Sequence, residues 1–141
     1  MKKFVFELED ILQFRKFEQE QAEIALAKAL SDEREIQEKI EMLAAQKVTN
    51  RRLVENSKSI EAIYSANQFS QFVNIQTEHL LKQKAELALI TEQKREALKK
   101  CIQNTDSLQS LKDSQFSEYK KNVRDAENKN IEDIISGRIN I

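Results

Sequence analysis

The near absence of residues that turn or break a chain is the feature that most constrains this sequence. There is no proline in its 141 residues, and the single glycine is Gly137. A compact fold of many short elements needs turns, and turns draw heavily on glycine and proline. The composition is instead rich in Ala, Glu, Lys, Leu, Gln and Ile, which favour helix over strand. These features predict an all-α protein with few and very long elements.

A heptad pattern runs through the first third of the chain when Val5 is taken as position a. Nine of the thirteen a and d positions are apolar, which is typical of a narrow coiled-coil seam and not of a broad core-facing stripe. The positions are Val5, Leu8, Leu12, Arg15, Gln19, Ala22, Leu26, Ala29, Glu33, Ile36, Ile40, Leu43 and Lys47.

A second heptad pattern starts at Phe69 and again has nine apolar residues in thirteen positions. After Leu111 the frame slips, and the pattern resumes at Phe116, which indicates a stutter. The positions before the slip are Phe69, Val73, Gln76, Leu80, Gln83, Leu87, Ile90, Lys94, Ala97, Cys101, Asn104, Leu108 and Leu111.

The chain reversal is expected between these two patterns, where Ser and Asn are concentrated. Ser65 and Gln68 have the spacing of a helix-capping box, and Tyr64 and Phe69 have that of a hydrophobic staple. Gly137 is expected just after the last helical residue. The sequence therefore predicts one domain over 1–141, an all-α, long antiparallel two-helix coiled-coil hairpin. Its parts are helix 1 (about 4–56), a turn (about 57–66), helix 2 (about 65–135) and a short C-terminal tail.

Four polar residues interrupt the first seam: Arg15, Gln19, Glu33 and Lys47. One interpretation is that they weaken the hairpin, which a partner then stabilises. The other is that they fix the register of the two helices. The sequence does not decide between them.

Catalysis and cofactor binding find little support in the sequence. His79 is the only histidine, Cys101 the only cysteine, and one glycine cannot build a phosphate-binding loop. We expect Cys101 to be a small apolar seam residue and His79 to lie half-exposed on a helix. The sequence predicts a non-enzymatic chain with no cofactor and no metal site.

Nucleic acid and membrane are also disfavoured as partners. The net charge is −1, with no strong one-signed stripe. The apolar opening meets Glu7, Glu9 and Asp10 too soon for a signal peptide, and no stretch approaches the ~20 residues of a membrane span. We expect a soluble, cytoplasmic protein with no direct membrane insertion.

Two groups of aromatic residues are candidates for protein binding. The opening group is Phe4, Phe6, Phe14 and Phe17. These rings either pack against the returning helix around 116–135 or remain exposed as a binding surface. The second group is Tyr64, Phe69 and Phe72 near the turn. Phe72 either packs over the turn or anchors a partner.

The opening residues resemble the N-terminus of the flagellar export protein FliJ family. The resemblance lies in the pattern F-x-F-x-L-x-x-I-L-x-F-R-x-x-E and the Ala- and Glu-rich continuation to Leu30. The matching residues are Phe4, Phe6, Leu8, Ile11, Leu12, Phe14, Arg15 and Glu18. Beyond residue 30 the similarity is one of length and two-helix plan.

The resemblance implies a fold, a role and a set of partners. Members form an antiparallel coiled coil similar to the γ subunit of rotary ATPases. They bind the type III export ATPase, FliI, promote assembly of its ring, engage the cytoplasmic domain of the export gate FlhA, and bind export chaperones. By this likeness the eight matching residues and 116–135 would meet the ATPase ring. Phe72, with Gln76, His79 and Gln83 as weaker matches, would meet the gate, at the membrane-bound apparatus.

Two other functions remain open from the sequence. The first alternative to the flagellar stalk is the equivalent stalk of a virulence type III secretion system. The chain is also compatible with a generic coiled-coil scaffold or chaperone that self-associates through its seams.

Overall fold

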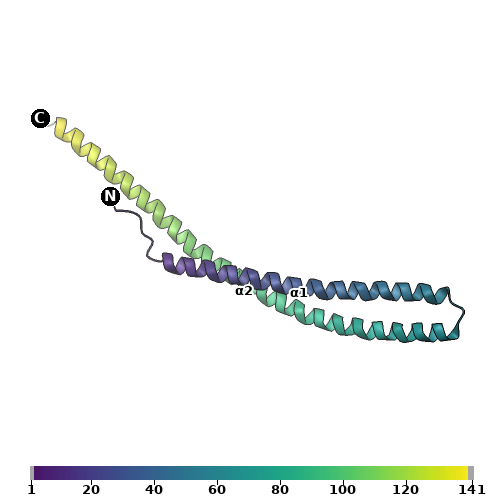
Figure 1. The fold of residues 1–141 in the computed structure, drawn as a ribbon. Helices are drawn as coiled ribbons and strands as arrows, with labels where there is room; N and C mark the ends of the chain where they lie inside the picture. Colours follow the sequence, from purple (N-terminus) through teal and green to yellow (C-terminus); the bar gives the residue numbers. More distant parts are fainter. Residues whose placement is uncertain (1, 140–141) are drawn as a thin grey trace. The chain divides into compact units, whose positions relative to one another are not determined.

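The computed structural model describes residues 2–139, which form two helices and no strand. Helix α1 is Glu9–Glu55 and helix α2 is Ile60–Ile139, with a turn of residues 56–59 between them (Figure 1). The two helices pack against each other, so the predicted all-α helical hairpin is confirmed. None of the described helices has an apolar stretch long enough to cross a bilayer.

Backbone proximity divides the hairpin into two compact units. The tip unit is Gln21–Leu98 and contains the turn. The terminal unit comprises Met1–Glu20 and Lys99–Ile141, of which residues 2–20 and 99–139 are described. The single domain predicted over 1–141 stays a prediction.

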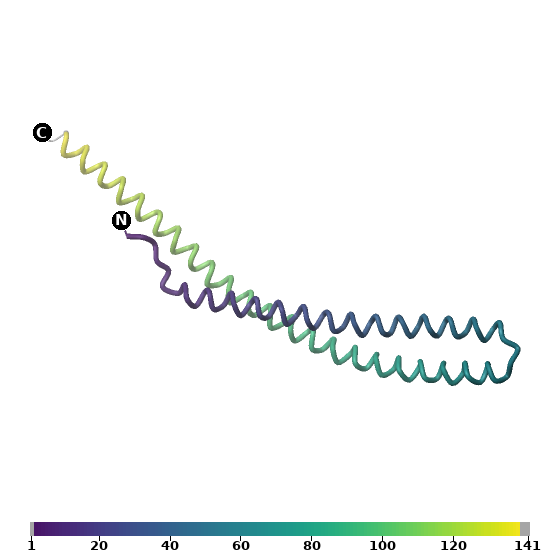
Figure 2. Tube along the Cα trace, viewed as in Figure 1, coloured from purple at the N-terminus to yellow at the C-terminus, as the bar shows by residue number. Residues whose placement is uncertain are grey.

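In the tip unit, α1 and α2 run antiparallel, as the chain trace in Figure 2 shows. The Lys47 Nζ atom donates to Asn74 Oδ1 at 2.8 Å, and Lys84 Nζ donates to Gln37 Oε1 at 2.6 Å. As the residue number falls along α1, that of its partner on α2 rises. The Asn50 side chain also donates to the carbonyl of Ala66 at 2.9 Å, next to the turn.

Small and β-branched side chains occupy the interior of the tip unit. Val73 is 1% exposed, Thr91 is 3% exposed, and Ala29 and Ala66 are also buried. The Thr91 hydroxyl donates to the carbonyl of Leu87 one turn earlier, so its buried donor has a partner. The predicted seam residues of α1 in this unit are all buried or half-buried, including Glu33 and Lys47.

The turn is shorter and lies earlier than predicted. Ser59 caps α2: its hydroxyl accepts a hydrogen bond from the Ala62 amide at 3.4 Å, and its carbonyl accepts one from Ile63 at 3.2 Å. Ser65, the predicted cap, lies exposed inside α2. The capping-box and staple assignments are therefore wrong, because the chain already has a cap six residues earlier.

In the terminal unit, the first residues are not helical. Residues 2–6 are irregular, residues 7–8 form a turn, and α1 starts at Glu9 and not near residue 4. Helix starts favour acidic side chains, and Glu9 and Asp10 supply them here. Because residues 2–6 are not helical, the heptad spacing does not determine which of their side chains are buried. Val5, a predicted seam residue, is 75% exposed, whereas Phe6 is only 6% exposed.

The terminal unit has its own antiparallel contacts. Leu12 is fully enclosed, at 0% exposure. The Thr105 hydroxyl lies within hydrogen-bond distance of two carbonyls, Cys101 at 2.9 Å and Arg15 at 3.3 Å. Near the helix start, Lys112 Nζ lies 2.8 Å from Glu9 Oε2.

The heptad frame of α2 changes earlier than predicted. In the tip unit the interior row passes from Leu87 to Thr91, where the sequence pattern predicts Ile90. In the terminal unit Thr105 is buried and Lys112 half-buried, while the predicted Asn104 and Leu111 are exposed. A four-residue step at Leu87–Thr91 accounts for this frame, as a stutter does. The predicted stutter after Leu111 is therefore misplaced.

The last part of α2 is not covered by any other described residue. Residues 124–138 are all exposed, and they include Ile131, Ile134 and Ile135. Gly137 lies within the helix and has no positive φ, so the predicted end of helix 2 near residue 135 is wrong. Only residues 140–141 of the predicted tail follow the helix, and they lie outside the described residues.

Candidate protein-binding surfaces

The described residues offer no cluster for metal chemistry. They contain no group of three or more His, Cys, Asp or Glu side chains placed to hold an ion. His79 is exposed, and its Nε2 atom lies 3.2 Å from the amide nitrogen of Gln83. Cys101 is half-buried on the interior side of α2. The exposed apolar side chains are therefore the candidate protein-binding surfaces.

Part of the N-terminal set packs inside the terminal unit. Phe6 and Leu12 are buried, and Leu8 is half-buried. The Phe4 ring lies 5.1 Å from that of Phe116 and 5.6 Å from that of Tyr119, measured between centroids. These side chains contribute to the packing of the unit, and Phe6 and Leu12 are enclosed by it.

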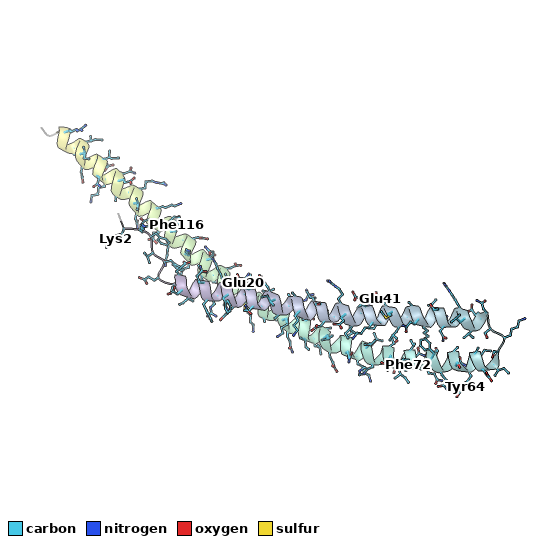
Figure 3. All side chains as sticks on the ribbon, in the orientation of Figure 1. Lys2, Glu20, Glu41, Tyr64, Phe72 and Phe116 are labelled. Carbon is cyan, nitrogen blue, oxygen red and sulfur yellow. The ribbon has the colours of Figure 1, made fainter. Side chains whose placement is uncertain are left out.

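The irregular segment before α1 is held by the same cluster of rings. The Tyr119 hydroxyl donates to the carbonyl of Lys2. Figure 3 shows Lys2 next to Phe116 on α2. Lys120 covers the Phe116 ring, with its Nζ atom 4.4 Å from the centroid, which is within cation–π range. The segment before α1 is therefore held against α2 at Lys2 and Phe4.

The rest of the N-terminal set faces solvent. Ile11 is 46% exposed, Phe14 56% and Phe17 55%. These three residues follow one another at i, i+3 and i+6, so they share one broad face of α1. Arg15 and Glu18 are half-buried and form an ion pair at 3.1 Å. We call Ile11, Phe14 and Phe17 the outer stripe.

One carboxyl group at the start of α1 is electrostatically perturbed. The hydrogen bond from Lys112 is the largest cause that lowers the pKa of Glu9 below its ordinary value of 4.5, and a bond from Gln13 at 2.9 Å adds to it. Glu9 thus joins α1 to α2 through a charged contact.

The set predicted near the turn also divides. Phe72 is 54% exposed and His79 is exposed, whereas Gln76 and Gln83 are half-buried at seam positions. On α2, Tyr64 is 65% exposed and Ile75 is 64% exposed. Tyr64 belongs to the aromatic group predicted near the turn, but neither residue was predicted to meet the gate. Figure 3 labels Tyr64 and Phe72 on this helix. Tyr64 and Ile75 lie eight and three residues from Phe72, and this helical spacing places all three side chains on one face of α2.

A groove in the tip unit was not predicted from the sequence. It consists of an open hollow of about 460 Å³ and an adjoining one of about 390 Å³. Asn50, Leu53 and Phe69 line both hollows. We call it the Phe69 groove. Its only sequence signal was Met42 and Leu53, large apolar residues of α1 that lie outside the a and d positions.

Comparison of the chain with protein-family models, curated proteins and solved structures finds no match.

Proposed function

We propose that this chain is a non-enzymatic stalk of the flagellar type III export apparatus. In this role it binds the export ATPase ring, FliI, through its terminal unit and promotes ring assembly. It links the ring to the cytoplasmic domain of the export gate FlhA and to export chaperones. It acts in the cytoplasm, peripherally at the membrane-bound apparatus. The proposal rests on the resemblance of residues 4–18 and on the hairpin fold.

The observation that carries the ATPase contact is the outer stripe. Three large apolar side chains, Ile11, Phe14 and Phe17, are each about half-exposed on one face of a thin helical pair. Exposing such rings without a partner is unfavourable, and contiguous exposed apolar surface marks interaction sites. Among the remaining residues of the motif, Phe6 and Leu12 are buried, and Arg15 and Glu18 form an ion pair.

The gate contact is assigned to Phe72 and His79, with Gln76 and Gln83 at its edge. An exposed aromatic ring is a favourable anchor for a protein interface. Tyr64 and Ile75 widen the same face, so we include them in the proposed gate surface.

The test is capture of the purified export ATPase by the full chain, with two triple variants compared. Ile11→Ser/Phe14→Ser/Phe17→Ser removes the outer stripe, and Tyr64→Ser/Phe72→Ser/Ile75→Ser removes an equally exposed face of the tip unit. We expect the first to lose about tenfold or more in ATPase affinity and the second to bind normally, since a few apolar anchors dominate interfaces.

Circular dichroism must show that both variants keep their helices. Equal ATPase binding by the two variants would remove the support for terminal docking. Replacing Leu8 and Leu12 by lysine is a poor test, because Leu12 is enclosed and the charge would disrupt the unit itself. If the chain is instead the stalk of a virulence secretion system, the same variants should lose binding to the ATPase of that system. Binding is therefore measured with the flagellar ATPase and with the virulence-system ATPase.

A self-associating scaffold is the second candidate, and the uncovered end of α2 favours it. Residues 124–138 expose Ile131, Ile134 and Ile135 at helical spacing. Sedimentation of the purified chain separates the two functions. A monomer across the micromolar range supports the stalk, whereas a stable dimer or tetramer that Ile131→Ser/Ile134→Ser dissociates supports the scaffold.

A further inference from the structure

We infer that a hollow on another flank of the tip unit binds a phosphate group, as the free ion or as a monoester on a larger molecule. The volume of this hollow is about 230 Å³, and α1 and α2 each supply one side of it. Its lining consists of Lys47, Asn50, Arg51 and Val54 from α1 and Ala66, Asn67 and Ser70 from α2. We call it the Lys47 hollow.

Four side chains of the Lys47 hollow can donate hydrogen bonds to an anion. Lys47 and Arg51 are four residues apart on α1, and Asn67 and Ser70 are three apart on α2, so each pair is adjacent on its helix. Phosphate oxygens accept several hydrogen bonds at once, and the bonds from charged donors are the strongest. Because all four donors are side chains, such a site needs no glycine-rich loop.

Most of this donor capacity is unused in the protein itself. Among the described residues, no hydrogen bond or ion pair involves the side chain of Arg51, Asn67 or Ser70, although Ser70 is half-buried. The Lys47 Nζ atom bonds at 2.8 Å to the neutral amide of Asn74, which positions its charge without compensating it. Two cations and two neutral donors are therefore available to a ligand.

The charge of the hollow favours phosphate over a carboxylate. No acidic side chain lines it. Glu55 follows Arg51 by four residues, but no ion pair joins the two among the described residues. Like charges four residues apart on a helix repel each other, so an anion between Lys47 and Arg51 is favourable. A phosphate monoester carries about −1.5 to −2 charges at neutral pH and compensates both cations, whereas a carboxylate compensates one.

The two sides of the hollow are already joined before a ligand binds. The Asn50 side chain donates to the carbonyl of Ala66 at 2.9 Å, and the Lys47–Asn74 bond joins the same two helices. Ala66 is buried beneath the hollow. Donors that are held in place before binding lose less conformational entropy when the ligand arrives, which favours affinity.

A bound phosphate group would join α1 to α2 beside the turn. Lys47 is one of the polar residues that interrupt the predicted seam of α1, and binding gives that interruption a purpose. A ligand that binds the folded hairpin and not the unfolded chain stabilises the hairpin by mass action.

The experiment is a ¹H–¹⁵N NMR titration of the full chain with sodium phosphate, in which sodium chloride keeps the ionic strength constant. We expect saturable shifts centred on Lys47, Arg51, Asn67 and Ser70. Glycerol 2-phosphate is titrated in the same way. Saturation by both compounds means that the hollow accepts monoesters, and saturation by phosphate alone restricts the inference to the free ion. Sodium acetate tests the carboxylate and should cause no saturable shift.

Single substitutions then locate the bound phosphate. Arg51→Gln is expected to weaken phosphate binding about tenfold, and Ser70→Ala about twofold, because bonds from charged donors are stronger than bonds from neutral ones. Arg52→Gln is the matched control, since Arg52 is the next residue of α1, has the same charge and does not line the hollow. It should leave the affinity unchanged. Circular dichroism checks that the three variants keep their helices.

Three results would overturn the inference. They are shifts that rise in proportion to phosphate without saturating, equal saturation by acetate, and equal loss of affinity in Arg51→Gln and Arg52→Gln. The titration contains no partner protein, so its outcome is independent of the proposed function.

Discussion

At the scale of single residues, Ile11 and Leu12 show how a two-helix structure divides neighbouring side chains. Leu12 has no exposed surface, whereas Ile11 is 46% exposed. A helix rotates by about 100° per residue, so one of two adjacent side chains faces α2 and the other faces solvent. The same division separates the motif into residues that build the terminal unit and residues of the outer stripe.

This division predicts unequal costs for equal truncations. Leu12→Ala should lower the free energy of unfolding by about 2–4 kcal/mol, because it removes enclosed methyl groups and leaves a cavity. Ile11→Ala should cost less than about 1 kcal/mol. Urea denaturation followed by circular dichroism measures both. Similar values for the two variants would contradict the packing described for the terminal unit.

Glu9 gives the terminal unit a pH-dependent contact. Its pKa is lower in the folded chain, chiefly because of Lys112, so its carboxylate stabilises the fold above its ordinary value of 4.5. That stabilisation is lost as the pH falls through the folded-state pKa. Lys112→Met should raise the pKa of Glu9, and Lys16→Met, which removes a more distant charge, should raise it less. An NMR titration of the side-chain carboxyl tests this order, and a reversed order would assign the shift to the wrong contact.

At the scale of elements, the seams were predictable and the helix ends were not. The rows Leu12–Lys47 of α1 and Phe69–Leu87 of α2 follow from heptad periodicity, and the structure places them in the interior. The frame beyond Leu87 could not be read from apolar residues, since Thr91, Thr105 and Lys112 take interior positions there. The start of α1 was also missed, because the rings of Phe4 and Phe6 continue the apolar pattern without being helical.

The start of α2 illustrates why caps are hard to predict. Ser57, Ser59 and Ser65 are all suitable cap residues by type, and only the backbone geometry selects Ser59. Gly137 was misread for the same reason, since a glycine near the end of a pattern ends a helix only where the chain turns.

The cap assignment predicts opposite behaviour for two serines. Ser59→Ala should destabilise the hairpin by about 1 kcal/mol, because the Ala62 amide loses its acceptor. Ser65→Ala should be neutral or slightly stabilising, since alanine is the better residue inside a helix. Thermal and urea unfolding of the two variants, measured side by side, decide the point. A larger loss for Ser65→Ala would restore the predicted later start of α2.

At the scale of the whole molecule, each unit is stabilised by contacts between residues far apart in the sequence. Thr105 lies against the Arg15 carbonyl, and Lys47 bonds to Asn74. Within residues 2–138 the fully buried large side chains are few, Leu12 and Val73. Most other side chains are exposed, so the fold leaves most of its surface open to partner proteins.

The aromatic residues indicated the outer stripe and Phe72 from the sequence alone. The Phe69 groove could not be predicted in this way, because it forms only where two helices pack and has no local sequence motif.

The central claim is that the chain folds back once on itself, and chemical cross-linking tests it most directly. In a Cys101→Ser background, Lys47→Cys/Asn74→Cys and Glu9→Cys/Lys112→Cys place thiols at paired positions of the tip unit and the terminal unit. Lys47→Cys/Glu86→Cys is the control, because residue 86 lies about 18 Å further along α2 than residue 74. The linker is a short bismaleimide, applied to an equal mixture of ¹⁴N- and ¹⁵N-labelled chains. We predict rapid cross-links at both paired positions, slow ones in the control, and products in which each link joins residues of the same isotope. Mixed-isotope products at the paired positions would mean that the helices pair between chains, and the hairpin would be wrong.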